Sequence, residues 1–166
     1  MGDAATRLGG EAAHLFRQYL NRIGESVAPL SDEHVWWRAN VRSNSIGNLL
    51  LHLEGNLSQW VLAGLGGEPF ERHRNAEFAA DRSAGATELM ARLRDVVERC
   101  IAVAAHIPES ALARSHSIQG YERDGFGVLL HAVEHMAYHT GQIVLLAKQL
   151  APADVEIEFY PHLKGI

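Results

Sequence analysis

Apolar residues recur every three or four positions along most of the chain, a spacing that predicts amphipathic helices rather than strands. The first such segment covers about residues 4–28 and stops ahead of Pro29, as helices usually do before a proline. A second begins at the possible cap residues 43–45. A third runs over about 87–107 and a fourth over about 124–150. The pattern therefore predicts four long helices.

Turn-forming and polar residues fill the segments between these helices. Ser31 can cap a single helical turn, after which at least one of the adjacent Trp36 and Trp37 is expected to close the end of a bundle. The polar loop at about 66–86 is long enough to be functional or to act as a lid. Residues 109–123 are predicted to be irregular, with a short extended excursion.

The fold class predicted by these segments is all-α. Four helices of this length suit a four-helix bundle, with a long loop between the second and third helices and an extended C-terminal tail. The chain lacks the alternation of strand and helix patterns that an α/β fold requires. It contains neither internal repeats nor long linkers, so we expect a single domain over residues 1–166.

Composition and charge narrow the possible partners. The chain has 166 residues, 47% of them apolar, and a net charge of −5 with acidic and basic residues interspersed, so it lacks the basic run that nucleic acid requires. No apolar stretch reaches the roughly 18 residues of a membrane span. The start, "MGDAATRLGG", lacks the apolar segment of a signal peptide. The lone Cys100 is expected to pack inside the protein. We therefore expect a cytoplasmic protein that binds neither nucleic acid nor a membrane.

The fourth helical segment carries an unusual row of histidines. His131, His135 and His139 are spaced four residues apart, which places them on one face of a helix. Gln142 lies on the same face, and apolar residues continue the line, so this face should look inward. Buried imidazoles are costly, so each needs a hydrogen-bond partner or a metal ion.

A metal site would need a third ligand besides His135 and His139, which can direct two nitrogens to one ion. The strongest candidate is His52, at the edge of the apolar face of the second helix, where it can reach a neighbouring helix. His14 is less favourable, because apolar neighbours occupy the inward stripe of the first helix. The alternative stays open: histidines that only form hydrogen bonds with polar neighbours where two helices meet.

The remaining histidines are expected at the surface. They lie in loops or near helix ends: His34, His73, His106, His116 and His162. Glu134 should face a neighbouring helix or solvent, while Tyr138 and Gln142 are candidate polar walls of the site.

Two segments together resemble a known family. "NSIGNLLLHLEGNLSQW", followed about 80 residues later by "LLHAVEHMAYHTGQI", looks like the DinB/YfiT-like superfamily, and closest to an uncharacterised branch of it. The resemblance covers most of the chain. It implies a four-helix bundle, often dimeric, that binds a divalent metal through three histidines. These fall on His52, His135 and His139, and His131 matches a recurrent histidine one turn earlier. Many members have a histidine where this chain has Tyr138.

The resemblance leaves the reaction open, because superfamily members share the metal rather than the substrate. Their activities include thiol-cofactor transfer, maleylpyruvate isomerisation and metal-dependent hydrolysis. We therefore expect a metal-dependent transferase or hydrolase, with Zn, Ni, Mn or Fe and a low-molecular-weight thiol as candidate cofactors. His131 is assigned to an outer-shell or proton-transfer role. The alternative function is a non-catalytic metal-binding or stress-related interaction bundle.

Overall fold

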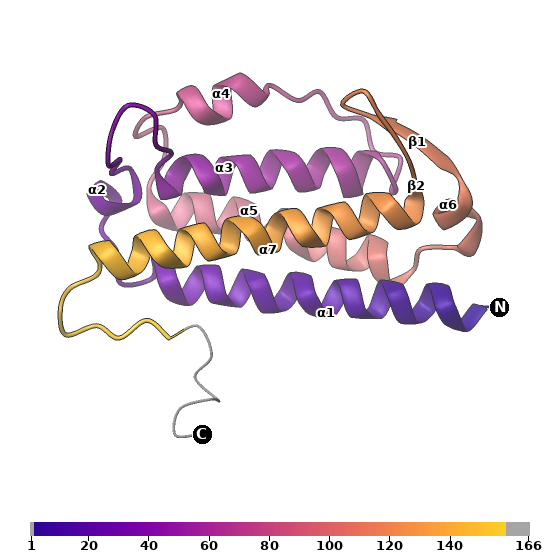
Figure 1. Ribbon diagram of the computed structural model, residues 1–166, viewed down its shortest axis with the longest axis horizontal. Coiled ribbons are helices and arrows are strands. Elements are labelled where there is room, and N and C mark those ends of the chain that lie inside the picture. Colours follow the sequence, from indigo (N-terminus) through magenta and orange to yellow (C-terminus); the bar gives the residue numbers. More distant parts are fainter. Residues whose placement is uncertain (1, 159–166) are drawn as a thin grey trace.

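Four long helices lie side by side in the computed structural model, which describes residues 2–158 (Figure 1). They are α1 (Gly2–Val27), α3 (Ile46–Leu57), α5 (Ala86–Ala105) and α7 (Gly125–Leu150). Both α1 and α3 pack against α5 and α7, which gives the predicted all-α bundle. A π-helical turn, η1 (Ser58–Ala63), extends α3 beyond its regular end.

The connections contain more structure than their sequences predict. The elements are α2 (Asp32–Val35), α4 (Arg74–Ala79), α6 (Glu109–Ala113), β1 (Ser115–Ile118) and β2 (Tyr121–Asp124). Helix α4 lies within the predicted long loop and packs on α3. The segment at 109–123, predicted to be irregular with a short extended excursion, forms the short helix α6 and then extended chain, as an antiparallel hairpin of β1 and β2. Gln119 and Gly120 both have positive φ at the hairpin turn, where glycine is tolerated best.

Polar side chains cap the helices where the sequence predicts them. Ser45 accepts a hydrogen bond from the backbone N–H of Asn48, whose side-chain oxygen accepts from the backbone N–H of Ser45, so α3 begins with a capping box. Asp124 caps α7 by accepting from Gly127 N, and Ser31 caps α2 in the same manner. These local bonds fix the starting points of the two helices that carry the histidines.

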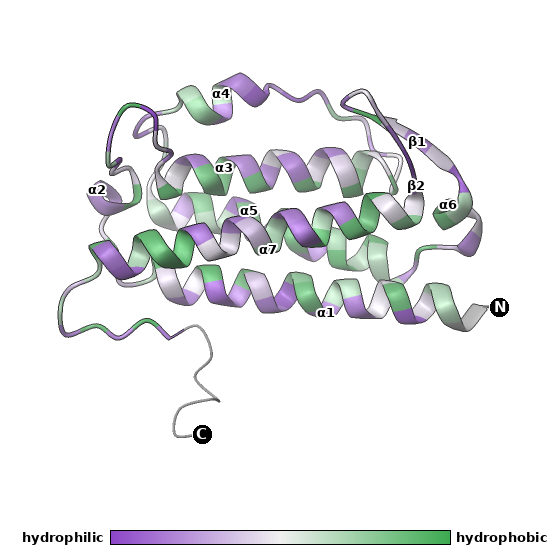
Figure 2. Ribbon diagram, in the orientation of Figure 1, coloured by the Kyte–Doolittle hydropathy of each residue, from purple (hydrophilic) through white to green (hydrophobic). Residues whose placement is uncertain are grey.

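The long helices combine hydrophobic and hydrophilic faces, and the hydrophobic faces meet inside the bundle (Figure 2). Phe16, Leu53, Leu93 and Met136, one from each long helix, are completely buried. Cys100 also lies in this core, as predicted, and burial raises the pKa of its thiol.

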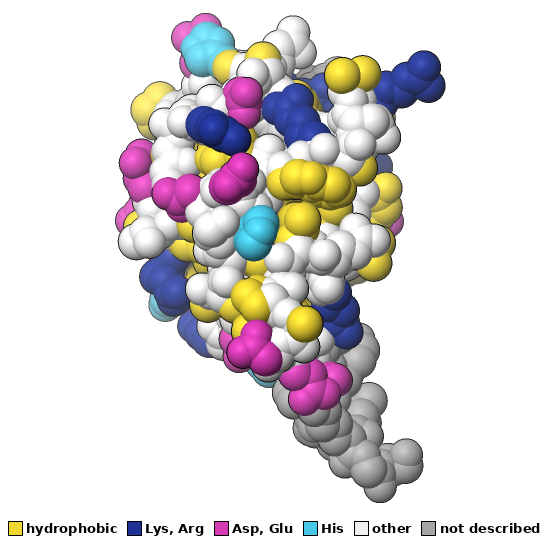
Figure 3. All heavy atoms as spheres, turned by 90° about the vertical axis from the view of Figure 1, so that its left-hand side faces the viewer, with side chains coloured by type: hydrophobic (Ala, Val, Ile, Leu, Met, Phe, Trp, Pro, Cys, Tyr) yellow, Lys and Arg dark blue, Asp and Glu magenta, His cyan; other side chains and the backbone are white. Residues whose placement is uncertain are grey.

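One end of the bundle is closed by Trp36, which is buried and donates a hydrogen bond from Nε1 to the carbonyl of Ala84. Trp37 is exposed, so one tryptophan of the pair closes the bundle, as the sequence predicts. The end face in Figure 3 carries acidic and basic side chains interspersed with apolar ones.

Beyond α7, residues 151–158 form neither helix nor strand. The remainder of the predicted tail, with His162, lies outside the described residues. Within residues 2–158, no helix has both the length and the hydropathy to cross a membrane.

Candidate metal centre

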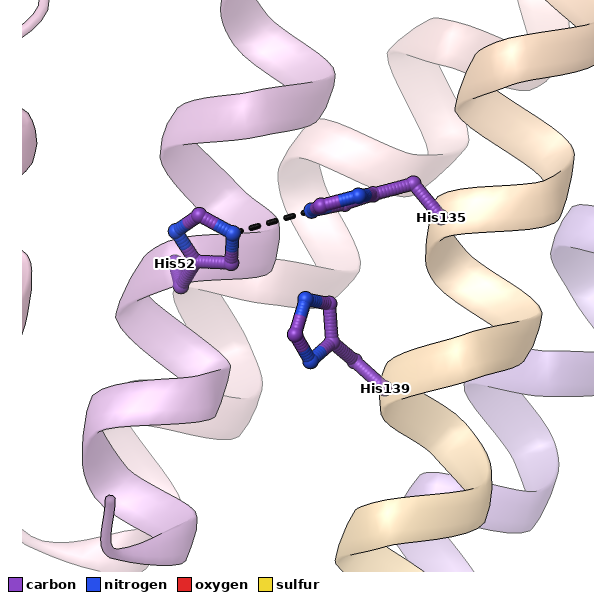
Figure 4. A group of neighbouring side chains, drawn as sticks. All are labelled: His52, His135 and His139. Carbon is purple, nitrogen blue, oxygen red and sulfur yellow. Dashed lines mark hydrogen bonds between the residues drawn. The ribbon is translucent and has the colours of Figure 1, made fainter. Parts of the chain in front are cut away.

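Helices α3 and α7 bring three imidazole rings together. Figure 4 shows His52 on α3 facing His135 and His139, which lie one turn apart on α7. One ligand atom from each ring lies within 4.8 Å of the other two. The Nε2 atoms of His52 and His135 are 2.9 Å apart. Two nitrogens that are each about 2.1 Å from one ion are separated by roughly 3.0 Å at an octahedral angle and roughly 3.4 Å at a tetrahedral one, so this spacing is close to that of a shared metal.

Burial favours the neutral, metal-binding form of His135 and His139. His52 and His139 are 4% and 8% exposed, and His135 is half-buried. Desolvation, reinforced by the nearby His139 and His52, lowers the pKa of His135 to about 3. Desolvation also lowers the pKa of His139, although its hydrogen bond to Gln142 opposes the shift.

A carboxylate holds the outer nitrogen of His52. Glu77 Oε2 lies 2.8 Å from His52 Nδ1 and, when ionised, can only accept, so Nδ1 donates and the Nε2 lone pair faces the other histidines. Arg72 donates from Nε and Nη2 to the same carboxylate, at 2.7 and 2.9 Å. Burial raises the pKa of Glu77, but the hydrogen bonds from His52 and Arg72 outweigh it and leave that pKa below its usual value. Glu77 is therefore ionised at neutral pH.

An amide holds the outer nitrogen of His139. Gln142 Oε1 accepts a 2.7 Å hydrogen bond from His139 Nδ1, which again leaves Nε2 free toward the cluster. Ligating histidines commonly donate their second nitrogen to a carboxylate or another oxygen acceptor, because this bond fixes the ring orientation. His52 and His139 both follow that arrangement.

Tertiary contacts of α4 bring Glu77 to His52. The buried Asn48 donates from Nδ2 to the backbone carbonyls of Glu77 and Ala80, each at 2.9 Å. Gly55 permits the close approach, because a Cβ at this position would lie 2.2 Å from Glu77 Oε1. The side chain of Asn48 and the absence of one at Gly55 thus position the carboxylate.

His131 lies beside the cluster rather than in it. Its ring centroid is 5.4 Å from that of His135 and 4.0 Å from that of Trp60 on η1. Within the described residues it forms no hydrogen bond with His52, His135 or His139. It lines a cavity of about 220 Å³ that His52 and His135 border. Desolvation lowers the pKa of His131, and the nearby Arg123 adds to the effect.

Most other sequence-based placements agree with the structure. His14, His73, His106 and Glu134 are exposed, while His34 is half-buried.

The surface placement of His116 was wrong. This residue is 8% exposed, because β1 turns it inward, where its Nε2 lies 3.2 Å from the carbonyl oxygen of Ala111. Tyr138 is exposed and meets His139 edge-on rather than walling the cluster.

Sequence reasoning missed Glu77 and Arg72. They lie in the polar connection and have no helical spacing relative to His52. The unusual length of that connection was the one available signal, and it indicates a functional loop without naming a residue.

A sequence profile described as a protein of unknown function, DUF1572, matches residues 4–159. The chain belongs to the DUF1572 family. No curated protein matches this DUF1572 chain.

Solved structures place this DUF1572 protein in the DinB-like fold. It superposes on a DinB-like protein from Bacillus subtilis, YjoA, with a TM-score of 0.68 at 19% identity, covering 90% of this chain and 96% of that one. A DinB-like protein from Bacillus cereus gives a TM-score of 0.66 at 16% identity, covering 89% of this chain and 93% of the other. At these identities the similarity establishes the fold.

Proposed function

We propose that this DUF1572 protein is a metal-dependent enzyme in which His52, His135 and His139 hold one divalent ion. The observation that carries the proposal is the convergence of three imidazoles, two of which have their outer nitrogens bound by Glu77 and Gln142. Neutral imidazole suits Zn, Ni, Mn and Fe, so the donor set fits such an ion without selecting among them.

Three protein ligands leave a coordination position for a small molecule, as in catalytic zinc sites. A divalent ion there would supply Lewis-acid chemistry and lower the pKa of a water or thiol that joins it. The protein supplies the surrounding cavity, which His131 lines as a neutral base able to accept a proton. Transfer from a thiol cofactor and hydrolysis are the two reactions that suit this arrangement.

A second candidate function is a non-catalytic metal-binding bundle. The burial of His52 and His139, each more than nine-tenths, favours it, because a deeply buried ion can serve stability alone. We also propose a cytoplasmic homodimer. Exposed apolar side chains on α7 support the dimer: Phe126, Leu130, Tyr138 and Leu145.

Elemental analysis of the untreated, purified protein tests the metal site. We expect about one divalent ion per chain, as in three-ligand metal sites generally, and its loss after dialysis in H52A, H135A and H139A. H14A is the matched control, because His14 is an exposed histidine on α1, and it should keep the ion. Wild-type stoichiometry in all three site variants would refute the assignment.

Product formation separates the two functions. Metal-loaded protein is incubated with low-molecular-weight thiols and electrophiles, and separately with hydrolysable esters and amides. Turnover that is lost in H135A supports the enzyme. A metal-loaded protein without turnover on either class favours the binding bundle.

A further inference from the structure

The cavity beside the three histidines is lined by four parts of the chain that are distant in sequence. Side chains from α3 and η1, from the segment around α4, from the hairpin and from α7 meet there. Its volume of about 220 Å³ compares with about 30 Å³ for a water molecule in the liquid, so roughly seven waters would fill it. A molecule of about four carbons with polar ends is of this size.

Two arginines at this cavity carry charges that the described part of the chain does not neutralise. Arg74 lies over the ring of Phe78 at 4.8 Å, and Arg123 lies 5.9 Å from the ring centroid of Tyr121. Among residues 2–158, neither forms an ion pair with a carboxylate. Stacking on an aromatic ring leaves the N–H groups of a guanidinium available to a ligand.

The third arginine of the cavity differs from these two. Arg72 donates to both oxygens of Glu77, so its charge is already paired. No aspartate or glutamate is among the described residues that line the cavity. A local excess of positive charge therefore borders the histidine cluster in a chain whose net charge is −5.

Two buried residues that line the cavity each have a polar atom without a partner among residues 2–158. Trp60 is 2% exposed, and its Nε1 has no hydrogen-bond partner within the described chain. An indole N–H can only donate, so its missing partner must be an acceptor. Asn56, one turn earlier and 2% exposed, has an unpaired Oδ1, but this oxygen only accepts and so cannot pair with an anion. Buried polar groups normally have partners, so the unpaired indole N–H points to a ligand that supplies an acceptor.

We propose that this cavity binds a small organic anion of the carboxylate class, with its charged end between Arg74 and Arg123. The other end of the anion then lies next to His52 and His135, which border the same cavity. Arginine and indole donors both require acceptor atoms, and a carboxylate supplies them with a charge that complements the arginines. The inference rests on the proposed function in one respect: the anion is the substrate or co-substrate of that metal centre.

Titration calorimetry with succinate as the probe tests the anion site. The neutral diol 1,4-butanediol, which has a similar carbon chain, is the comparison ligand. Both are titrated into metal-loaded protein and into protein stripped with chelator and then dialysed. We expect succinate to bind both forms and the diol to bind neither.

The double variant R74Q/R123Q should weaken succinate binding by at least about tenfold, because hydrogen bonds to charged groups are the strong ones in such a site. The matched control is R17Q/R94Q, which removes the same charge from exposed positions on α1 and α5. It should leave succinate binding unchanged. Equal affinity for succinate and the diol, or equal affinity in wild type and R74Q/R123Q, would overturn the proposal.

Metal content measured on the same samples keeps the two proposals separate. R74Q/R123Q should retain its ion, because neither arginine contacts His52, His135 or His139. A wild-type protein that holds an ion but does not bind succinate would overturn the anion site alone. Succinate binding to a wild-type protein that takes up no divalent ion would overturn the metal centre alone.

Discussion

The two pairs of long helices bury different kinds of side chain: α1 and α5 bury apolar ones, whereas α3 and α7 bury histidines among theirs. Phe16 on α1 and Leu93 and Cys100 on α5 are fully buried, and no charge or imidazole interrupts them. Between α3 and α7, His52 and His139 are also buried, at 4% and 8% exposed. The first pair of helices excludes water with apolar side chains, while the second pair buries groups that normally remain hydrated.

Apolar and polar side chains contribute differently to the free energy of folding when they are buried. Burying apolar surface stabilises a fold by about 25 cal/mol per Å², whereas a buried polar group costs free energy unless it is bonded. Glu77 and Gln142 provide those bonds for His52 and His139. A bundle gains little stability from such an arrangement compared with leucines at the same positions, which supports the proposal that the α3–α7 side binds a ligand.

Phe16→Ala should give the largest effect on stability. Truncation of a fully buried phenylalanine removes its transfer free energy and leaves a cavity, so the free energy of unfolding should fall by about 3–5 kcal/mol. Denaturant unfolding measures this loss. Metal affinity of the folded variant should stay at the wild-type value, and a parallel loss of affinity would show that the two sides of the bundle are not independent.

Glu77→Gln should act on the metal site. We expect a loss of metal affinity of about 10–100-fold, as for other partners of ligating histidines. The metal-free protein should lose stability as well, because the buried guanidinium of Arg72 loses its counter-charge. Competition with a chromophoric chelator measures the affinity. Glu71→Gln is the control, because Glu71 lies in the same connection with its side chain 88% exposed.

Gly55→Ala should reproduce the effect of Glu77→Gln without changing a charge. A methyl group at this position would overlap Glu77 Oε1 and push the carboxylate from His52. Unchanged metal affinity in Gly55→Ala would mean that the position of Glu77 does not matter to the ion.

Acidification should destabilise the metal-free protein through the same cluster. Since the folded-state pKa of His135 is depressed to about 3, the unfolded chain takes up protons first as the pH falls below about 6.5. Stability is therefore present above pH ~6.5 and is lost as the pH falls toward the folded-state value.

Partial exposure of His135 screens this effect, so we expect it to lower the melting temperature by only about 2–4 °C, equivalent to about 1 kcal/mol. Thermal melts at pH 7 and pH 5 measure it. His135→Ala should show a smaller decrease, and identical decreases would contradict the role of this ring.

His131→Ala should have the smallest effect on the ion. The ring of His131 packs at a tilt against Trp60 and does not form a hydrogen bond with His52, His135 or His139. Metal affinity should therefore fall by less than the tenfold expected when a side chain bonded to a ligating histidine is removed. The chelator competition used for Glu77→Gln measures it. A loss of the ion in this variant would make His131 a ligand.

The histidines could be predicted because their placement is a local property. Helical spacing alone sets His135 and His139 on one face, and the edge position of His52 follows from the apolar pattern of its own helix. The same local rules located the cap at Asp124 and narrowed the other cap to residues 43–45, of which Ser45 is the one used.

Glu77 and His116 could not be predicted because tertiary contacts decide their environment. Glu77 reaches His52 only after the amide of Asn48 has bound the backbone of α4. His116 is buried by a hairpin whose strands are too short for a clear alternation. Short elements of this kind depend on what they pack against rather than on their own periodicity.

The buried Cys100 has a kinetic consequence. It is the only cysteine of the chain, it is completely buried, and its Sγ lies 3.8 Å from the carbonyl oxygen of Leu57. Burial blocks access of a thiol reagent and also suppresses the reactive thiolate, so labelling requires α5 and α3 to separate. The labelling rate of the unmodified protein thus reports how often the bundle opens. A bound ligand that connects α3 to α7 would lower this rate.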